Sequence, residues 1–166
     1  MDAAKRAALA ELYARAWKIY KKAPGSVFDL FDREPAGARK RQLARVAESA
    51  DYLVENLHRV PVHVVPCTGG RIDQISGEFA SVGLASVFGS ILPATWSFML
   101  AARARGLGTA WTTCHLMFEA EAAEILEIPY EKVSQVALIA TAYSIGTDFK
   151  PALRKPMDDV LHLDRW

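Results

Sequence analysis

The sequence is poor in cysteine, in net charge and in unbroken apolar stretches, and each shortage excludes a class of protein. Its 166 residues contain two cysteines, Cys67 and Cys114, which stand far apart and show no CxxC or CxH spacing. A disulfide scaffold is therefore excluded, and a reducing compartment is indicated. Twenty basic and nineteen acidic residues give a formal net charge of +1. This balance argues against a wide nucleic-acid footprint and against a strongly anionic membrane partner.

Targeting and membrane signals are also missing. The first residues resemble the start of an amphipathic helix and lack the apolar core of a signal peptide. The longest apolar stretch, residues 82–102, contains Gly83, Gly89 and Pro93, which disfavours a span of about 20 mostly apolar residues. With 51% hydrophobic and 23% charged residues, the composition is that of a folded domain. We expect a soluble, cytoplasmic protein with a single domain over residues 1–166.

The hydrophobic pattern predicts the α+β class, with long helices and few strands. Apolar side chains recur every three or four positions over residues 2–22, 37–58 and 119–126, which predicts three amphipathic helices. Short strands are expected over residues 60–66 and 109–113, and a longer buried strand over residues 133–144. Residues 23–36 and 67–77 are expected to form loops. The tail from residue 146 has few apolar residues and is expected to wrap across a surface.

One further helix is predicted over residues 86–105, and it is unusual because it is apolar on nearly every face. Such a helix is buried all round, in a core or in a subunit interface. Pro93 fits the first turn if the helix begins near Ser90; otherwise it kinks a longer helix. The pattern therefore predicts an obligate homodimer packed through this helix, with Trp96 and Phe98 near the contact.

Common catalytic and cofactor motifs are weak or missing. The four histidines are scattered without a second ligand at helical spacing, so a metal site is not indicated. Gly106 and Gly108 form the first half of a dinucleotide fingerprint, but they follow a helix and lack the third glycine. No G-x-S-x-G motif is present. These observations exclude a Rossmann site and offer no nucleophile.

Two segments remain as candidates for binding. Small hydroxyl residues follow the strand predicted at 109–113, where backbone N–H groups and a hydroxyl can meet a planar heterocycle. Arg154 and Lys155 precede a proline and suit a phosphate, with arginine as a bidentate donor and lysine as a point charge. The competing interpretation of this basic pair is a solvated turn.

The run SILPATWSFMLAARARGLGTAWTT over residues 90–113 closely resembles the FMN-dependent nitroreductase family. The likeness continues through IPY at 128–130, QVALIATAY at 135–143 and FKPALRKPMDDV at 149–160, so it covers the chain from about residue 40 onward. It implies a mixed central sheet flanked by helices, a homodimer, and FMN in a groove at the dimer interface.

The resemblance also implies the site residues and the activity. Trp111, Thr112, Thr113 and Cys114 match the segment that passes the flavin ring, and the backbone N–H groups of Thr113 and Cys114 would face N5 and O4. Arg154 and Lys155 match the pair that holds the FMN phosphate. The implied activity passes a hydride from NAD(P)H, through flavin N5, to a small electron-poor acceptor such as a nitro compound or quinone. No residue is expected to act as an obligatory acid or base.

The sequence departs from the family at its start. The Arg-Ser-x-Arg cluster and the P-S-x-x-N-x-Q-P-W segment are not found, so the chain is expected to be N-terminally truncated relative to the family. The alternative function is therefore a non-catalytic dimeric remnant, or a flavin-sequestering protein that has lost this cofactor arm.

Overall fold

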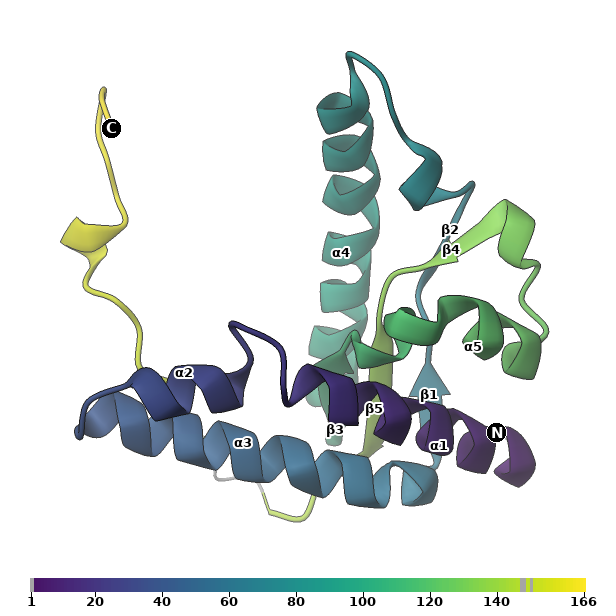
Figure 1. Ribbon diagram of the computed structural model, residues 1–166, viewed down its shortest axis with the longest axis horizontal. Coiled ribbons are helices and arrows are strands. Elements are labelled where there is room, and N and C mark those ends of the chain that lie inside the picture. The colour runs from purple at the N-terminus through teal and green to yellow at the C-terminus, as the bar shows by residue number, and fades with distance from the viewer. Residues whose placement is uncertain (1, 147–148, 150) are drawn as a thin grey trace.

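The computed structural model describes residues 2–146, 149 and 151–166, and it confirms the α+β class (Figure 1). The α-helices are α1 (Ala3–Tyr20), α2 (Val27–Arg33), α3 (Ala38–Asn56), α4 (Ala80–Ala104) and α5 (Glu119–Leu126). The strands are β1 (Val62–Val64), β2 (Cys67–Gly69), β3 (Leu107–Thr112), β4 (Val133–Gln135) and β5 (Leu138–Tyr143). Short 3-10 turns follow α3 at Leu57–Arg59 and precede α5 at Cys114–Phe118.

Helix α1 confirms the first predicted helix and supplies much of the core. The Asp2 carboxylate caps it by accepting hydrogen bonds from the backbone N–H groups of Ala4 and Lys5, at 2.7 and 3.0 Å. The buried stripe of α1 consists of Leu9, Ala10, Leu12, Tyr13, Ala16 and Trp17. Trp17 Nε1 donates to the Asp51 carboxylate at 2.7 Å, which fixes α1 against α3.

The main sheet has three antiparallel strands, with β5 between β1 and β3. Leu138 and Ala140 of β5 point to one face, as alternate strand residues must, and they pack with Leu9, Leu12 and Ala122. The core therefore lies between this face of the sheet and helices α1 and α5. Among the described residues, parallel pairing is confined to one bridge between Gly70 and Val133.

The strand predicted over residues 133–144 is two strands in two sheets. β4 pairs with β2, whereas β5 joins the main sheet. Between them the Val136 N–H donates to the Pro66 carbonyl at 2.9 Å. A continuous apolar run carries no alternation that would mark such a break. The pairing with β4 also makes residues 67–69 a strand, where a loop was predicted.

The prediction of a loop over residues 23–36 was wrong, because α2 lies within it. Ser26 Oγ accepts from the Asp29 N–H at 3.2 Å, and the Asp29 carboxylate pairs with Arg33 one turn later at 2.8 Å. The spacing of Ser26 and Asp29 is a helix-start signal that the sequence contains. Phe28 of α2 packs edge-on against Trp17, with ring centroids 5.8 Å apart.

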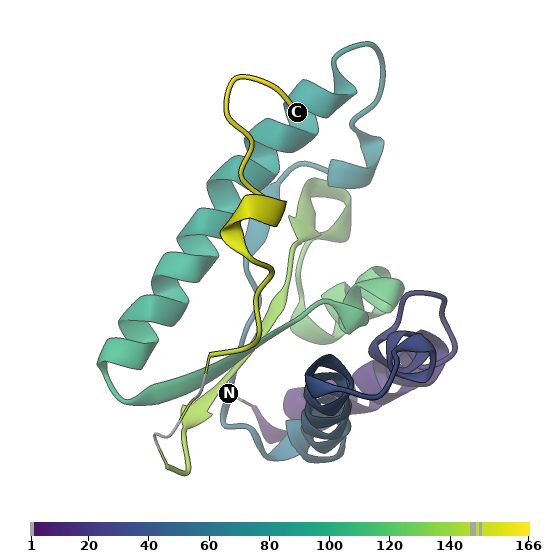
Figure 2. The same cartoon turned by 90° about the vertical axis from the view of Figure 1, so that its left-hand side faces the viewer.

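Helix α4 begins at Ala80, before the predicted helix over residues 86–105, so Pro93 lies inside a longer helix and not in its first turn. Because proline has no N–H, the Gly89 carbonyl loses its usual donor there. Of its residues only Thr95 and Ala102 are buried within the described chain, so the chain itself does not bury α4 all round. Figure 2 shows α4 standing apart from α1, α2 and α3. Among the described helices, α4 alone is long and apolar enough to cross a membrane. A single helix of this kind is weak evidence for a membrane span.

The C-terminal tail lies away from the body of the chain. Residues 151–166 are all exposed, and Figure 1 shows the tail leaving the fold beside α3. Its hydrogen bond to the helices runs from the Leu153 N–H to Gln42 Oε1 of α3, at 2.7 Å. Earlier in the tail, the Phe149 ring lies 4.3 Å from the guanidinium carbon of Arg103 in α4. The tail therefore meets α3 and α4 at a few points, and it does not wrap closely across a surface.

Candidate functional site

The segment expected beside a flavin ring lies where β3 ends. Trp111 and Thr112 are the last residues of β3 and pair with Ile139 and Leu138 of β5. Thr113 links the strand to the 3-10 turn that begins at Cys114. Because β3 is a sheet edge, its outer side remains open to a neighbouring group.

The side chains of this segment point in different directions. The Thr112 hydroxyl lies 2.7 Å from the hydroxyl of Tyr13, a residue of α1 that is 2% exposed. Cys114 packs against the core cluster, and burial raises the pKa of its thiol, partly opposed by the hydroxyls of Tyr13 and Thr112. Thr112 and Cys114 therefore anchor the segment to α1, and they offer their backbone rather than their side chains to a ligand.

Two of these backbone groups are available as donors. Within the described residues, the N–H groups of Thr113 and Cys114 donate to no acceptor, whereas the Thr113 carbonyl accepts from the Leu116 N–H at 2.9 Å. Thr113 is exposed and Cys114 is half-buried, so a ligand that accepts hydrogen bonds could reach these N–H groups. This arrangement is compatible with the role that the resemblance implies for them.

The structure brings Trp111 and the basic pair onto one groove along α3, which we call the α3 groove. Its two adjoining cavities have volumes of about 770 and 560 Å³ and share Gln42. Trp111 lines the first cavity, together with Arg45 and Ala152. The second is lined by Arg39, Gln42, Leu43, Leu153, Arg154 and Lys155.

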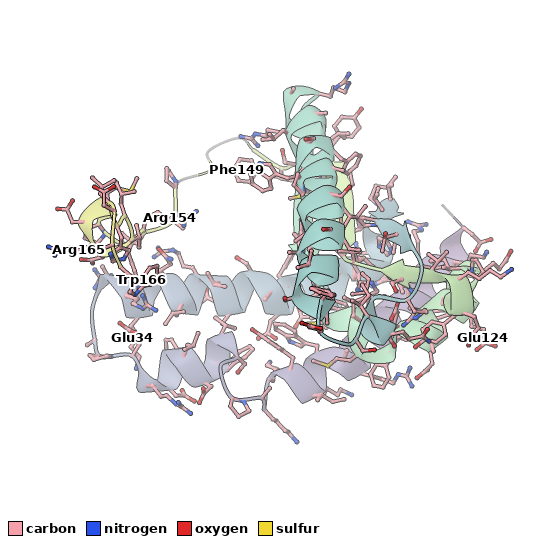
Figure 3. The ribbon with its side chains drawn as sticks, turned by 90° about the horizontal axis from the view of Figure 1, so that it is seen from above. Glu34, Glu124, Phe149, Arg154, Arg165 and Trp166 are labelled. Atoms are coloured by element: carbon pink, nitrogen blue, oxygen red, sulfur yellow. The ribbon has the colours of Figure 1, made fainter. Side chains whose placement is uncertain are left out.

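The charge of the α3 groove gathers at its second cavity. Arg154 and Lys155 are exposed, and Figure 3 shows Arg154 on the tail near the N-terminal end of α3. Arg39 also lines this cavity, and its guanidinium is 3.1 Å from the Glu34 carboxylate. Four cationic side chains therefore line the groove, and Arg39 and Arg45 were not among the predicted site residues.

The start of α3 bears on Arg39, which lies in the first turn, whereas Arg45 lies beyond it. The helix begins after Gly37 with no side-chain cap and no acidic residue in its first turn. The partial positive charge of a helix N-terminus is unfavourable for nearby arginines and favourable for anions. A bound phosphate would relieve this repulsion. The basic run over residues 39–45 was the sequence signal that could have found these residues.

A second charged cluster is structural. The Arg71 side chain is 4% exposed and binds both carboxylate oxygens of Glu119, at 2.9 and 3.1 Å. It also donates to the carbonyls of Tyr130 and Val133, at 3.2 and 3.0 Å. The Glu119 carboxylate holds the pKa of the guanidinium above its ordinary value. These bonds use the donors of Arg71 within the chain and tie the loop after β2 to α5 and β4.

The histidine and cysteine side chains of the described residues are not gathered into a metal centre. The described residues contain no group of three or more histidine, cysteine, aspartate or glutamate side chains placed to hold an ion. His115 is fully buried, and neither of its ring nitrogens has a partner in the described structure. Burial lowers its pKa to about 4. Cys67 and Cys114 are free thiols.

Of the predicted site residues, Trp111, Arg154 and Lys155 line the α3 groove, whereas Thr112, Thr113 and Cys114 line neither of its cavities. The sequence model of the nitroreductase family matches residues 3–143, and the chain belongs to that family. The match begins earlier than the expected residue 40 and covers Trp111, Thr112, Thr113 and Cys114. It ends before Arg154 and Lys155.

Other comparisons add little. No curated protein matches the chain. The chain is similar to a solved structure described as a BluB-like flavoprotein from Clostridium difficile 630, at 17% sequence identity and a TM-score of 0.48. The similarity covers 94% of this chain and 76% of that one.

Proposed function

We propose that the chain is an FMN-dependent oxidoreductase that passes a hydride from NAD(P)H to a small electron-poor acceptor, such as a nitro compound or a quinone. Membership of the nitroreductase family supports flavin oxidoreductase chemistry in general. The observation that carries the proposal further is the α3 groove, where Trp111 and the pair of Arg154 and Lys155 line adjoining cavities.

The residues of the α3 groove fit FMN in size and in charge. Its two cavities are each of the size that small-molecule sites usually have, roughly 300–1,000 Å³. The indole of Trp111 offers a flat surface at the first cavity. The second combines Arg154 and Lys155 with the start of α3, which favours a phosphate dianion.

Each part of the site has a distinct role in this proposal. Arg154 and Lys155 bind the phosphate, and the backbone N–H groups of Thr113 and Cys114 donate hydrogen bonds to the edge of the ring. The bond between Tyr13 and Thr112 holds these donors in place from α1. Bound FMN supplies hydride transfer at N5, and the protein orients it and limits competing reactions. A proton can come from water, so no side chain needs to act as acid or base.

The proposal includes a homodimer packed through α4. Trp96 is 56% exposed, Leu100 is 55% exposed and Phe98 is 38% exposed in the single chain. Large apolar surfaces of this kind mark contacts with a partner. A second copy would cover α4 without placing it in a membrane, in keeping with a cytoplasmic protein that binds neither nucleic acid nor lipid.

Substitution at Ala101 tests the dimer. This residue is exposed in the single chain, so Ala101→Glu is compatible with the chain's own fold, but it would place an unpaired charge in the interface. We expect the unchanged protein to sediment as a dimer and the variant to dissociate or precipitate. A stable folded monomer of the unchanged protein at micromolar concentration would contradict the dimer.

The colour of the purified protein tests the activity. We expect a yellow protein with flavin absorbance near one FMN per chain, bleached by NADH or NADPH and restored by a quinone. A protein that binds FMN without bleaching would favour the flavin-sequestering alternative. A colourless dimer that takes up no added FMN would favour the non-catalytic remnant.

A further inference from the structure

The backbone donors proposed to meet the flavin ring lie at the start of a short turn, and this turn is held at both ends. Before the turn, the Thr112 hydroxyl lies 2.7 Å from that of Tyr13 in α1. After the turn, Glu119 begins α5 and is bound to two distant segments. The proposed function assigns a role to the first anchor and none to the second.

The second anchor centres on the Glu119 carboxylate, whose side chain is 17% exposed. Its Oε1 accepts from the backbone N–H of Gln135 in β4 at 2.8 Å, and Arg71 binds both of its oxygens. In return, the Gln135 side-chain amide donates to the Glu119 carbonyl at 3.0 Å. Both the side chain and the main chain of Glu119 are therefore fixed against β4.

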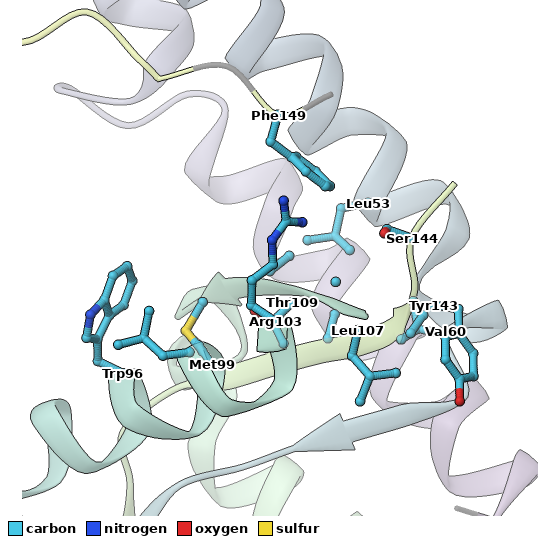
Figure 4. Close-up of a pocket in the computed structure, with 15 residues that line it drawn as sticks. Leu53, Val60, Trp96, Met99, Arg103, Leu107, Thr109, Tyr143, Ser144 and Phe149 are labelled. Atoms are coloured by element: carbon cyan, nitrogen blue, oxygen red, sulfur yellow. The ribbon is translucent and has the colours of Figure 1, made fainter. Parts of the chain in front are cut away.

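Stability alone does not account for this anchor, because the cost of taking two charges out of water offsets most of their attraction. Arg71 also lies over the Tyr130 ring, at 3.9 Å from its centre. Arg103 lies over Phe149 in a similar way, yet both of those residues are exposed in the single chain (Figure 4). What distinguishes Arg71 is the bidentate pair with Glu119, which fixes a direction as well as a distance.

The turn between the two anchors, Cys114–Phe118, is closed and packed. The Thr113 carbonyl accepts from the Leu116 N–H at 2.9 Å. The His115 side chain is fully buried, so the middle of the turn cannot rotate without breaking its packing. The direction of the N–H groups at the start of the turn therefore depends on where Glu119 is held.

From these contacts we infer that Glu119, held by Arg71 and Gln135, is a positioning residue for the proposed ring donors. The inference rests on the proposed function, because it concerns how the chain presents these donors to FMN. Donors that are fixed before the ligand arrives lose little freedom on binding. Glu119 itself makes no contact with the flavin in this account.

Calorimetric titration with FMN and with 5-deaza-FMN isolates the ring donors. The two probes share the phosphate and the ring shape, but 5-deaza-FMN has a C–H group in place of the N5 acceptor. We expect the unchanged protein to bind FMN about fivefold more tightly, as for one hydrogen bond between neutral groups. Glu119→Gln turns an amide N–H toward Arg71 and breaks the bidentate pair, so it should bring the two affinities close to equality.

Riboflavin provides the readout that a general loss of structure would change. The ratio of the affinities for FMN and riboflavin measures phosphate recognition, which is remote from Glu119, and it should be the same in Glu119→Gln as in the unchanged protein. A variant that merely loosens the fold should lower this ratio as well.

Two further variants complete the test. Glu121→Gln is the matched control, because Glu121 lies in the same helix and pairs with Arg15 at the surface; it should keep the preference for FMN over 5-deaza-FMN. Gln135→Met removes the donor to the Glu119 carbonyl and leaves no buried charge unpaired. It should lower the preference in part, and it decides the question if Glu119→Gln fails to fold.

Three results would each overturn the inference while leaving FMN binding by the unchanged protein in place. They are equal affinities for FMN and 5-deaza-FMN in the unchanged protein, a preference that survives both Glu119→Gln and Gln135→Met, and an equal fall in the ratio of FMN to riboflavin affinities. A protein that binds no flavin contradicts the proposed function itself, and the inference with it.

Discussion

Helices α1 and α4 are both long and rich in apolar side chains, yet their surroundings differ. Six residues of α1 are buried, whereas α4 has two although it is the longer helix. The apolar residues of α1 form a stripe that α5 and the main sheet can cover. Those of α4 surround the helix, and one small chain cannot cover every side of it. The comparison indicates that α1 is stabilised within the chain, whereas α4 is the helix that we propose packs against a second copy.

Matched leucine variants in α1 and α4 should show the largest difference in their effect on the free energy of unfolding. Leu12 is 2% exposed and Leu100 is 55% exposed. We expect Leu12→Ala to lower the free energy of unfolding by about 2–5 kcal/mol, because it leaves a core cavity. Leu100→Ala should act mainly through association, so its effect on the denaturation midpoint should depend on protein concentration. If Leu100→Ala caused a large loss of stability that did not depend on protein concentration, the proposed difference between α1 and α4 would be contradicted.

Acid should destabilise the α1 region through His115. Burial lowers the pKa of His115 to about 4 in the folded chain, so the unfolded state binds the proton more readily between that value and the ordinary pKa of about 6.5. Its contribution to stability is complete above pH 6.5 and is lost as the pH falls, by about 3 kcal/mol at pH 4.

Urea denaturation at several pH values measures this effect of His115. The variant His115→Leu should show a weaker fall in stability between pH 7 and pH 4 than the unchanged protein. His162→Leu, in the exposed tail, is the control and should preserve the fall. Identical pH profiles for the unchanged protein and His115→Leu would contradict the assignment.

A smaller effect is expected from the bond that joins α1 to the candidate site. Tyr13→Phe removes the hydroxyl that lies 2.7 Å from the Thr112 hydroxyl, and we expect a loss of about 1 kcal/mol in the free energy of unfolding. It should also weaken FMN binding, because the segment carrying the Thr113 and Cys114 donors loses its anchor. Tyr52→Phe, at a 63% exposed tyrosine, should change neither quantity.

The sequence predicted the elements in which apolar residues recur with a clear periodicity. The apolar stripe of α1, the whole of α5 and the strand near Trp111 were found, because each has a regular pattern and a clear stop. The division between β4 and β5 was missed because the run through Val136 and Ala137 is apolar throughout. The start of α4 at Ala80 precedes the predicted helix over residues 86–105, and of the two positions considered for Pro93 the structure has the one inside a longer helix.

The candidate site was predicted in part. The sequence motifs indicated Trp111, Arg154 and Lys155, and the structure brings them to one groove. Which way Thr112 and Cys114 point depends on the packing of β3 against α1, a contact between distant segments that no local pattern encodes. Arg39 and Arg45 were missed although they belong to a basic run over residues 39–45, because the sequence does not show that the tertiary fold places this run beside the tail.

The central claim, that the α3 groove binds FMN with Arg154 and Lys155 at its phosphate, is tested most directly by calorimetric titration with FMN and with riboflavin, which lacks the phosphate. We expect FMN to bind more tightly than riboflavin. Arg154→Ala should weaken the affinity for FMN by roughly 10- to 150-fold, as expected for the loss of a hydrogen bond to a charged group. The affinity for riboflavin should remain nearly unchanged. Equal affinities for the two flavins in the unchanged protein, or an Arg154→Ala variant that keeps full FMN affinity, would contradict the account.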